Sequence, residues 1–443
     1  MRISAVIVLL SLTAGVSSAQ ERLFGSFDDP AEQPSRTSWV SEGSLGVFAG
    51  LSLIGPQWRS KGKIIGEVQM PSFNARISAA LRAGLYGAFE EDIDEPYDLV
   101  RTIEHVHMSR WSGETYLRLG PLDRTRLGLG QVVNFHTSWA TWDERSVGVE
   151  FAARGTHVGV EGFLSDVRLD NLFGGRVNVH PLGFARARAA SSFELAVAGI
   201  YDRGPIPEEA ERFGALTVET QIEAWRSGAF GLFPFASYSW SRHRGQGLFV
   251  GADLRSDNFI DLARIHFRVA LHFNGTRFLP GYVGPTWNVH GPYARVLKAE
   301  PSDGATSADS LAGIHVSAVP KNEALETELR ILIFDRFEFW YRFVRNFAST
   351  ELSEFNLRMF ANAGNLRLMI GQDRGGLAGI FSLFDALGDL NLLRFEIAYR
   401  LGSSAWVLVE ARYTYETAGR VDGLPRFRVE RRFDPLVGMK LTF

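Results

Sequence analysis

Residues 263–274 read ARIHFRVALHFN, and the character of their side chains alternates at every second position. The apolar series is Ile265, Phe267, Val269, Leu271 and Phe273, and the polar series is Arg264, His266, Arg268, His272 and Asn274. Successive side chains of a β-strand point to opposite faces, so this pattern predicts a strand with one apolar and one polar face. A strand buried in a soluble β-sandwich would not carry such a second face. The sequence therefore raises the question of what the apolar face contacts.

The same alternation recurs from about residue 43 to the C-terminus, and helical periodicity is nearly absent. Residues 336–343 (RFEFWYRF) and 393–401 (LRFEIAYRL) repeat it with a charged second face. Two architectures fit alternation: a soluble β-sandwich with apolar faces in a core, and a transmembrane barrel with apolar faces in lipid. We favour the barrel because nearly every polar face is charged and because only a closed sheet satisfies every backbone group in lipid.

The connections between these segments alternate between short and long, as in barrels with short periplasmic turns and longer external loops. The short ones are Gly402 to Ser404, Asn362 to Gly364, Asp335-Arg336, Ser227-Gly228 and Arg154-Gly155. The long ones lie near 417–424, 374–389, 347–353, 275–321, 203–213 and 165–173. We predict an all-β transmembrane antiparallel barrel of about 18 strands, with 16 to 20 allowed and both termini periplasmic.

The strand count is least certain near the N-terminus. The segments 43–54, 62–70, 73–89, 99–109 and 113–135 give an odd total if each is a separate span. Because both ends of the barrel are expected on one side, the total must be even. We therefore expect one segment to be bent, merged with a neighbour or outside the membrane.

Composition excludes several classes of protein. The chain has 443 residues, no cysteine and a net charge of −3, so we expect neither disulfides nor nucleic acid as a partner. Residues 1–19 combine Arg2, an apolar stretch and small residues before Gln20, which predicts a cleaved signal peptide. Residues 20–42 are rich in Ser, Pro, Asp and Glu and predict a periplasmic lead-in to a barrel of residues 43–443. After Gln20 no apolar run is long enough for a transmembrane helix.

The signal peptide, the alternating strands and the last strand, which ends in VGMKLTF, resemble the outer-membrane β-barrel proteins of diderm bacteria. The resemblance implies a location in the outer membrane, in contact with lipid and lipopolysaccharide, and it allows oligomers. In that class a terminal strand with a final phenylalanine is the signal read by the barrel-assembly machinery. The resemblance assigns this signal to Val437, Met439, Leu441 and Phe443.

The sequence contains few candidate residues for catalysis or metal binding. No G-x-S-x-G, H-E-x-x-H or P-loop motif is present, so we expect no enzyme activity and no cofactor. His105 and His107 share a strand face, as do His266 and His272, and histidines in a watery lumen explain both pairs better than metal ligands do. Residues 89–98 (FEEDIDEPYD) offer oxygen ligands for calcium without the spacing of an EF-hand, so we predict a solvated acidic loop and no metal site.

The polar face of the strands supplies the side chains that we expect to line the lumen. An Arg or Lys on the lipid face would cost about 2–4 kcal/mol at the membrane midplane, so the charges must point inward. The pore-lining candidates are Arg264, His266, Arg268, Arg342, Arg358, Arg367, Arg394, Glu396, Arg400, Glu410, Arg412 and Lys440. Arginines clustered at a constriction would favour anionic solutes, whereas charges paired across the lumen would form an ion-pair network that plugs the barrel. A mild excess of basic candidates favours the first arrangement.

Two long loops, 275–321 and 374–389, are expected to control access to the lumen. Residues 278–293 (FLPGYVGPTWNVHGPY) either fold into the mouth or stay outside against lipopolysaccharide, and residues 376–390 (GLAGIFSLFDALGDL) have the spacing of a short loop helix. The leading hypothesis is a channel for passive uptake or export of small polar, anionic or carbohydrate-like solutes. The alternative is a non-conducting barrel that serves as a scaffold for surface polysaccharide or envelope assembly.

Overall fold

The computed structural model describes residues 43–443 apart from several gaps. The gaps are residues 71, 85–86, 89–94, 111–114, 170–171, 204–212, 242–244, 260–261, 291–292, 300–310, 316–318, 335, 378–390 and 422–423. The predicted signal peptide and lead-in, residues 1–42, therefore lie outside the described residues, as do most of the acidic loop and most of the predicted loop helix.

Among the described residues, twenty antiparallel strands form one closed sheet. Their bounds are β1 (Gly43–Ile54), β2 (Gln57–Met70), β3 (Phe73–Gly84), β5 (Ile103–Arg110), β6 (Thr115–Gly120), β7 (Gly148–Arg154), β8 (Val158–Leu164), β9 (Leu172–Val179), β10 (Glu194–Asp202), β11 (Gly214–Gln221), β13 (Phe230–Ser241), β14 (Gly245–Phe259), β15 (Ala263–Asn274), β18 (Asn322–Ile333), β19 (Phe337–Asn346), β20 (Glu354–Ala363), β21 (Leu366–Gly375), β22 (Asn391–Arg400), β23 (Ala405–Val421) and β24 (Leu424–Thr442). Two short strands, β4 (Gly87–Ala88) and β12 (Trp225–Ser227), pair with the ends of β3 and β13.

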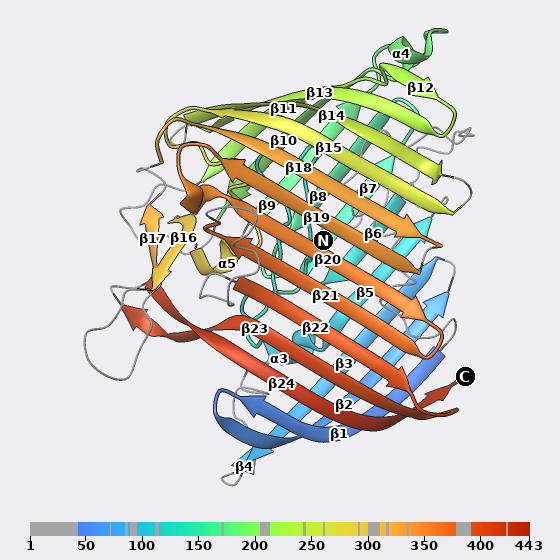
Figure 1. Ribbon diagram of the computed structural model, residues 1–443, viewed down its shortest axis with the longest axis vertical. Coiled ribbons are helices and arrows are strands. Elements are labelled where there is room, and N and C mark those ends of the chain that lie inside the picture. The colour runs from blue at the N-terminus through green and yellow to red at the C-terminus, as the bar shows by residue number, and fades with distance from the viewer. Residues whose placement is uncertain are drawn as a thin grey trace, which may run out of the picture.

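The first and last strands close the ring. β1 pairs with β2 along one edge and with β24 along the other, where Ser44 lies opposite Thr442 and Leu53 opposite Phe433. Every other strand of the ring pairs with its neighbours in the chain, and the strands cross the molecule at a common tilt (Figure 1). A sheet closed in this way leaves no edge with unpaired backbone groups, which is the condition for a sheet that lies in lipid.

Gly43 and Phe443 exchange backbone hydrogen bonds of 3.1 and 3.0 Å, so both ends of the barrel lie at the same rim, called here the terminal rim. The turns at Gly402 to Ser404, Asn362 to Gly364 and Arg154-Gly155 lie at this rim, and residues 275–321 connect strands at the opposite rim. The alternation has exceptions. The β1–β2, β13–β14 and β23–β24 connections at the opposite rim are short, and residues 180–193 form a longer connection at the terminal rim that contains α4 (Arg188–Ser191).

The structure has twenty strands, more than the favoured count of about 18 and at the upper limit of the predicted range of 16 to 20. The first four N-terminal segments are all separate strands, and only residues 115–120 of the predicted 113–135 segment form a strand, β6. β6 ends because Gly120 adopts a φ of +148° and Pro121 has no backbone N–H to donate to a ladder. At 417–424 the predicted loop is instead the end of the β23–β24 hairpin.

Helices are short. The described ones are α3 (Tyr97–Arg101), α4, α5 (Trp287–His290) and the 3₁₀ turn η5 (Thr350–Leu352). None of the described helices has the length and apolar character needed to cross a membrane. A separate hairpin of β16 (Tyr293–Ala299) and β17 (Leu311–His315) stands beyond the opposite rim, at the end of the molecule away from the C-terminus (Figure 1).

Candidate functional site: the closed lumen

Residues 121–147, called here the plug segment, connect β6 to β7 at the opposite rim and fold back into the barrel. Every residue from Arg124 to Trp142 is buried, although the segment contains neither a helix nor a strand. The backbones of Thr125 and His136 exchange hydrogen bonds of 2.9 and 3.0 Å, which makes residues 125–136 a hairpin-like excursion. The plug segment is therefore an ordered element inside the lumen.

The tip of the plug segment is fixed through its backbone. Gly128 donates its N–H to Glu161 Oε1 (2.8 Å), and Leu129 donates its N–H to Glu219 Oε1 (2.9 Å). Arg268 Nη1 donates to the Leu129 carbonyl oxygen at 2.8 Å. These partners lie on β8, β11 and β15, so three separate wall strands hold the tip.

Ion pairs fix the first half of the plug segment on the opposite wall. Arg126 Nη2 lies 2.8 Å from Glu328 Oε2 on β18, and Asp123 Oδ1 lies 3.0 Å from Arg358 Nη2 on β20. Burial disfavours a charged Asp123, yet Arg358 and Arg124 outweigh it and hold the pKa of Asp123 well below its usual range. Asp123 is thus ionised at neutral pH.

Asp143 fixes the second half of the plug segment. Its carboxylate oxygens accept from Arg432 Nη1 at 3.1 Å and Arg432 Nη2 at 2.6 Å, and Arg82 Nη2 lies 3.3 Å from Oδ1. Burial opposes the charge, but Arg432 and Arg82 keep the pKa of Asp143 well below its usual range. The plug segment is therefore tied to β3 and β24 as well as to β18 and β20.

A second loop covers the plug segment. Val283 exchanges backbone hydrogen bonds of 3.0 Å with Asn134 and Val132, and Gly281 donates to the Gln131 carbonyl oxygen at 2.7 Å. Most described residues of 278–289 are buried, so of the two alternatives for this loop the structure shows the inward one. His136 Nδ1 lies 3.3 Å from the Gly284 carbonyl oxygen, and burial lowers the pKa of His136 to about 4.

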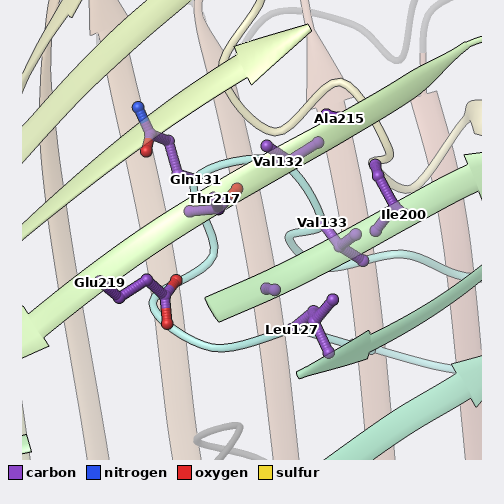
Figure 2. A pocket seen from close by; sticks show the side chains of 9 residues that line it. Leu127, Gln131, Val132, Val133, Ile200, Ala215, Thr217 and Glu219 are labelled. Atoms are coloured by element: carbon purple, nitrogen blue, oxygen red, sulfur yellow. The ribbon is translucent and has the colours of Figure 1, made fainter. Parts of the chain in front are cut away.

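Apolar side chains seal one side of the plug segment. They pack with β8 to β11 and with the covering loop in a cluster that comprises Leu122, Leu127, Val132, Val133, Phe163, Leu172, Ala198, Ile200, Phe213, Ala215, Phe278, Leu279, Tyr282, Val283, Trp287, Val319 and Leu352. A cavity of about 10 Å³ remains between Leu127, Val133 and the wall residues Ile200, Ala215 and Glu219 (Figure 2). Such a cavity holds at most about one water molecule, so it is no solute site.

The predicted pore-lining residues occupy different environments. His266, Arg268, Arg342, Arg358, Arg367, Glu396, Glu410, Arg412 and Lys440 are buried. Arg264 and Arg394 are half-buried, and Arg400 is exposed at the terminal rim, where it donates to Asn365 Oδ1 at 2.9 Å. Many of the buried cations contact a carboxylate. The pairs are Arg268–Asp253 (2.7 Å), Arg342–Glu326 (2.8 Å), Arg358–Asp373 (2.9 Å), Arg412–Glu410 (3.4 Å) and Lys440–Glu67.

The expected excess of basic side chains is absent from the buried set. Among the described residues, buried Lys and Arg are nearly equal in number to buried Asp and Glu. The observed balance differs from the expected basic excess because further acidic residues are buried that the pore-lining candidates did not include. They are Glu67, Asp253, Glu326, Glu354, Asp373, Glu430 and Asp434. Arg186 and Arg188 are exposed in the 180–193 connection and add no buried positive charge. The paired arrangement is therefore the one that the geometry shows.

The outer face of the barrel is apolar. On β24 Val437, Met439 and Leu441 are 60–61% exposed, while Lys440 between them is 4% exposed. Exposed aromatic side chains stand near both rims, with Trp58, Tyr201 and Trp240 at the opposite rim and Trp225, Tyr399 and Phe443 at the terminal rim. An apolar band between two aromatic belts on a closed sheet is the surface that a bilayer requires. The chain therefore has the architecture and the surface of a transmembrane β-barrel.

No protein-family model matches this barrel, and no curated protein matches it. Among solved structures it is similar to OpdL of Pseudomonas aeruginosa, with 10% identity and a TM-score of 0.32 over 90% of this chain and 98% of OpdL. It is also similar to OccAB4 of Acinetobacter baumannii, with 8% identity and a TM-score of 0.31 over 93% of this chain and 100% of OccAB4. A mutant of the ferric enterobactin receptor PfeA of P. aeruginosa gives 11% identity and a TM-score of 0.32 over 91% and 81% of the two chains. Sequence identities and TM-scores as low as these support no functional argument.

The plug segment is what sequence reasoning missed. Residues 113–135 are one of the five N-terminal segments considered as strands, of which one is expected to be bent, merged or outside the membrane. In the structure residues 121–135 of this segment lie inside the lumen. Gly120-Pro121 and the pair of glycines at 128 and 130 are the signals that break the strand pattern. Among the described residues, no group of three or more His, Asp or Glu side chains is arranged to hold a metal ion.

Proposed function

We propose that this barrel is a channel for small polar solutes, closed at rest by the plug segment. The observation that carries the proposal is that a separate loop, tied to the wall by ion pairs and backbone hydrogen bonds, fills the lumen. The terminal rim is periplasmic in this proposal, and the plug segment and its covering loop enter from the outside.

The width of the barrel favours a channel over a barrel that is filled by its own wall side chains. Side chains alone fill a barrel of about 8 strands, whereas barrels of about 16 strands or more enclose a water-filled or plugged lumen. A barrel of twenty strands therefore needs an additional element to close it, and the plug segment is that element. Because water and solutes can replace polar contacts, a plug held partly by ion pairs on one wall can leave that wall.

The solutes that such a lumen would pass are polar. Carboxylates and guanidinium groups line the walls on both sides of the plug segment, with Arg176, Arg268 and Arg342 among the most deeply buried side chains. The near balance of buried charge gives no general preference for anions, so a preference would have to come from a particular site. Contact with lipopolysaccharide, recognition of β24 by the barrel-assembly machinery and oligomer formation remain predictions from the class.

Shortening the plug segment tests the proposal. Replacing residues 126–135 by Asn-Gly joins Thr125 to His136, a hydrogen-bonded pair that a two-residue hairpin turn connects without strain. We expect planar bilayers with the intact barrel to be nearly silent and those with the shortened variant to show steady ion conductance. Arg336→Gln removes one arginine from an exposed turn instead of the lumen and should behave as the intact barrel does.

A second function fits one observation. The paired charges of the buried face also suit a permanently closed barrel that acts as an envelope scaffold. In that case the shortened variant would fold, as shown by its heat-dependent migration on a gel, and would stay silent. A wild-type barrel that conducts as well as the shortened variant would instead contradict closure by the plug segment.

A further inference from the structure

We propose that Arg82 and Arg432 form a carboxylate-binding clamp, which Asp143 fills in the closed barrel and which the carboxylate of an incoming solute takes over. The inference rests on the proposed channel function and deepens it, because it names a solute class and the contact that the solute replaces. Asp143 is then the latch of the plug segment.

The geometry is that of a carboxylate site. Arg432 presents two parallel N–H groups to the two oxygens of Asp143, at 3.1 and 2.6 Å, which is the bidentate fork that binds carboxylates with high specificity. Arg82 Nη2 donates to both oxygens, at 3.3 and 3.4 Å. Two guanidinium groups from β3 and β24 therefore hold one carboxylate, and that carboxylate belongs to a loop.

The clamp is built into the wall, whereas its occupant is partly open to solvent. The side chains of Arg82 and Arg432 are 3% and 4% exposed, and the side chain of Asp143 is 18% exposed. Arg82 lies two residues before Gly84, the end of β3 at the opposite rim, and Arg432 lies in register with Ile54, the end of β1 at that rim. A solute that arrives from outside would therefore meet this contact early.

The other ionic contacts of the plug segment do not offer the same site. Arg126 presents a cation to a wall carboxylate, Glu328, so its departure would leave a site for cations. Asp123 shares Arg358 with the wall residue Asp373, which lies 2.9 Å from the guanidinium and keeps it neutralised. At Asp143, by contrast, the plug segment offers a carboxylate to two wall arginines.

Charge balance at the clamp favours replacement of the Asp143 carboxylate by another anion. Arg432 also contacts Glu430 at 2.5 Å, so Asp143 provides the second carboxylate for two guanidinium groups. In register, Lys61 lies opposite Arg82 and Arg412 opposite Arg432, and both of these cations already contact carboxylates, namely Glu410 and Asp434. Withdrawal of Asp143 without a substitute would leave buried positive charge, which is costly, whereas a solute carboxylate would restore the balance.

Channel opening tests the latch. We expect Asp143→Asn to raise the open time in planar bilayers by roughly tenfold or more, the loss typical of a charged hydrogen bond. Glu323→Gln removes one negative charge from an exposed position at the same rim and should leave the open time unchanged. Succinate added to the side of the opposite rim should raise the open time of the intact barrel, and its uncharged analogue succinamide should not.

Solute flux tests the clamp itself. In liposomes the Asp143→Asn variant should take up succinate several times faster than succinamide, and adding Arg82→Gln and Arg432→Gln should abolish that difference. The inference is overturned if Asp143→Asn matches Glu323→Gln while the shortened plug variant conducts, or if the succinate preference survives without the two arginines. Silence of the shortened plug variant would instead refute the channel function, so the two failures are distinct.

Discussion

At the scale of single residues, Gly128 decides whether the tip of the plug segment fits. It has a φ of +58°, a left-handed conformation that side chains with a Cβ rarely adopt. A Cβ at this position would also lie 2.2 Å from Glu219 Oε2, an oxygen that accepts from Arg176 Nε at 2.7 Å. The turn and its wall contact therefore both require glycine.

We predict that Gly128→Ala loosens the plug segment. Left-handed strain alone costs about 1–2 kcal/mol, and displacement of Glu219 adds to it, so open time in bilayers should rise roughly tenfold or more. Gly66→Ala is the matched control, because a Cβ there meets no atom within 4 Å. Equal open times for the two variants would show that the tip does not control closure.

At the scale of the element, the plug segment has two differently held sides. Towards β8 to β11 it packs through apolar side chains such as Leu127 and Val133, and towards β18, β20, β24 and β3 it is held by ion pairs. Water or the charged groups of a solute can replace the contacts of an ion pair, whereas neither can replace apolar packing. Opening is therefore expected to begin on the ionic side.

Docking of the plug segment should weaken in mild acid because of His136. Its pKa is about 4 when docked and returns to about 6.5 when water reaches the ring. Between these pH values the released segment binds a proton and the docked one does not, so docking weakens by up to about 1.4 kcal/mol, or tenfold, per pH unit. Asp123 and Asp143 have depressed pKa values, so their contribution is intact above their ordinary pKa and does not change in this window.

We therefore expect open time in bilayers to rise as pH falls from about 6.5 towards 4. His136→Gln keeps a neutral side chain that can donate to Gly284, and it should give a nearly flat profile over the same range. A wild-type profile that is flat, or a variant profile as steep as the wild type, would rule out His136 as the cause.

At the scale of the whole molecule, charge balance predicts weak ion selectivity once the lumen opens. Buried cations and carboxylates are nearly equal in number among the described residues, and the shortened plug loses only Arg126 as a charged group. In a salt gradient the permeability ratio of chloride to potassium should stay within roughly twofold of unity. A strong preference for anions would contradict this prediction. It would instead support the earlier hypothesis of a pore lined mainly by arginines.

The local alternation of side chains determined much of this protein. In β15 and β24 it fixes which residues face lipid, because adjacent side chains of a strand must point to opposite faces. Closure follows from the same pattern, since apolar strands with charged second faces have no other stable arrangement in lipid. The assembly role of Phe443 and the cleavage near Gln20 remain predictions from sequence.

Only the tertiary structure decided what fills the lumen. Asp143 and Arg432 are 289 residues apart in the chain, and no local pattern relates them. The path of residues 121–147 depends on partners from β3, β8, β11, β15, β18, β20 and β24, which meet only when the ring closes. Periodicity records which face a residue occupies, whereas pairing across the lumen depends on register and strand count, and these are properties of the closed barrel alone.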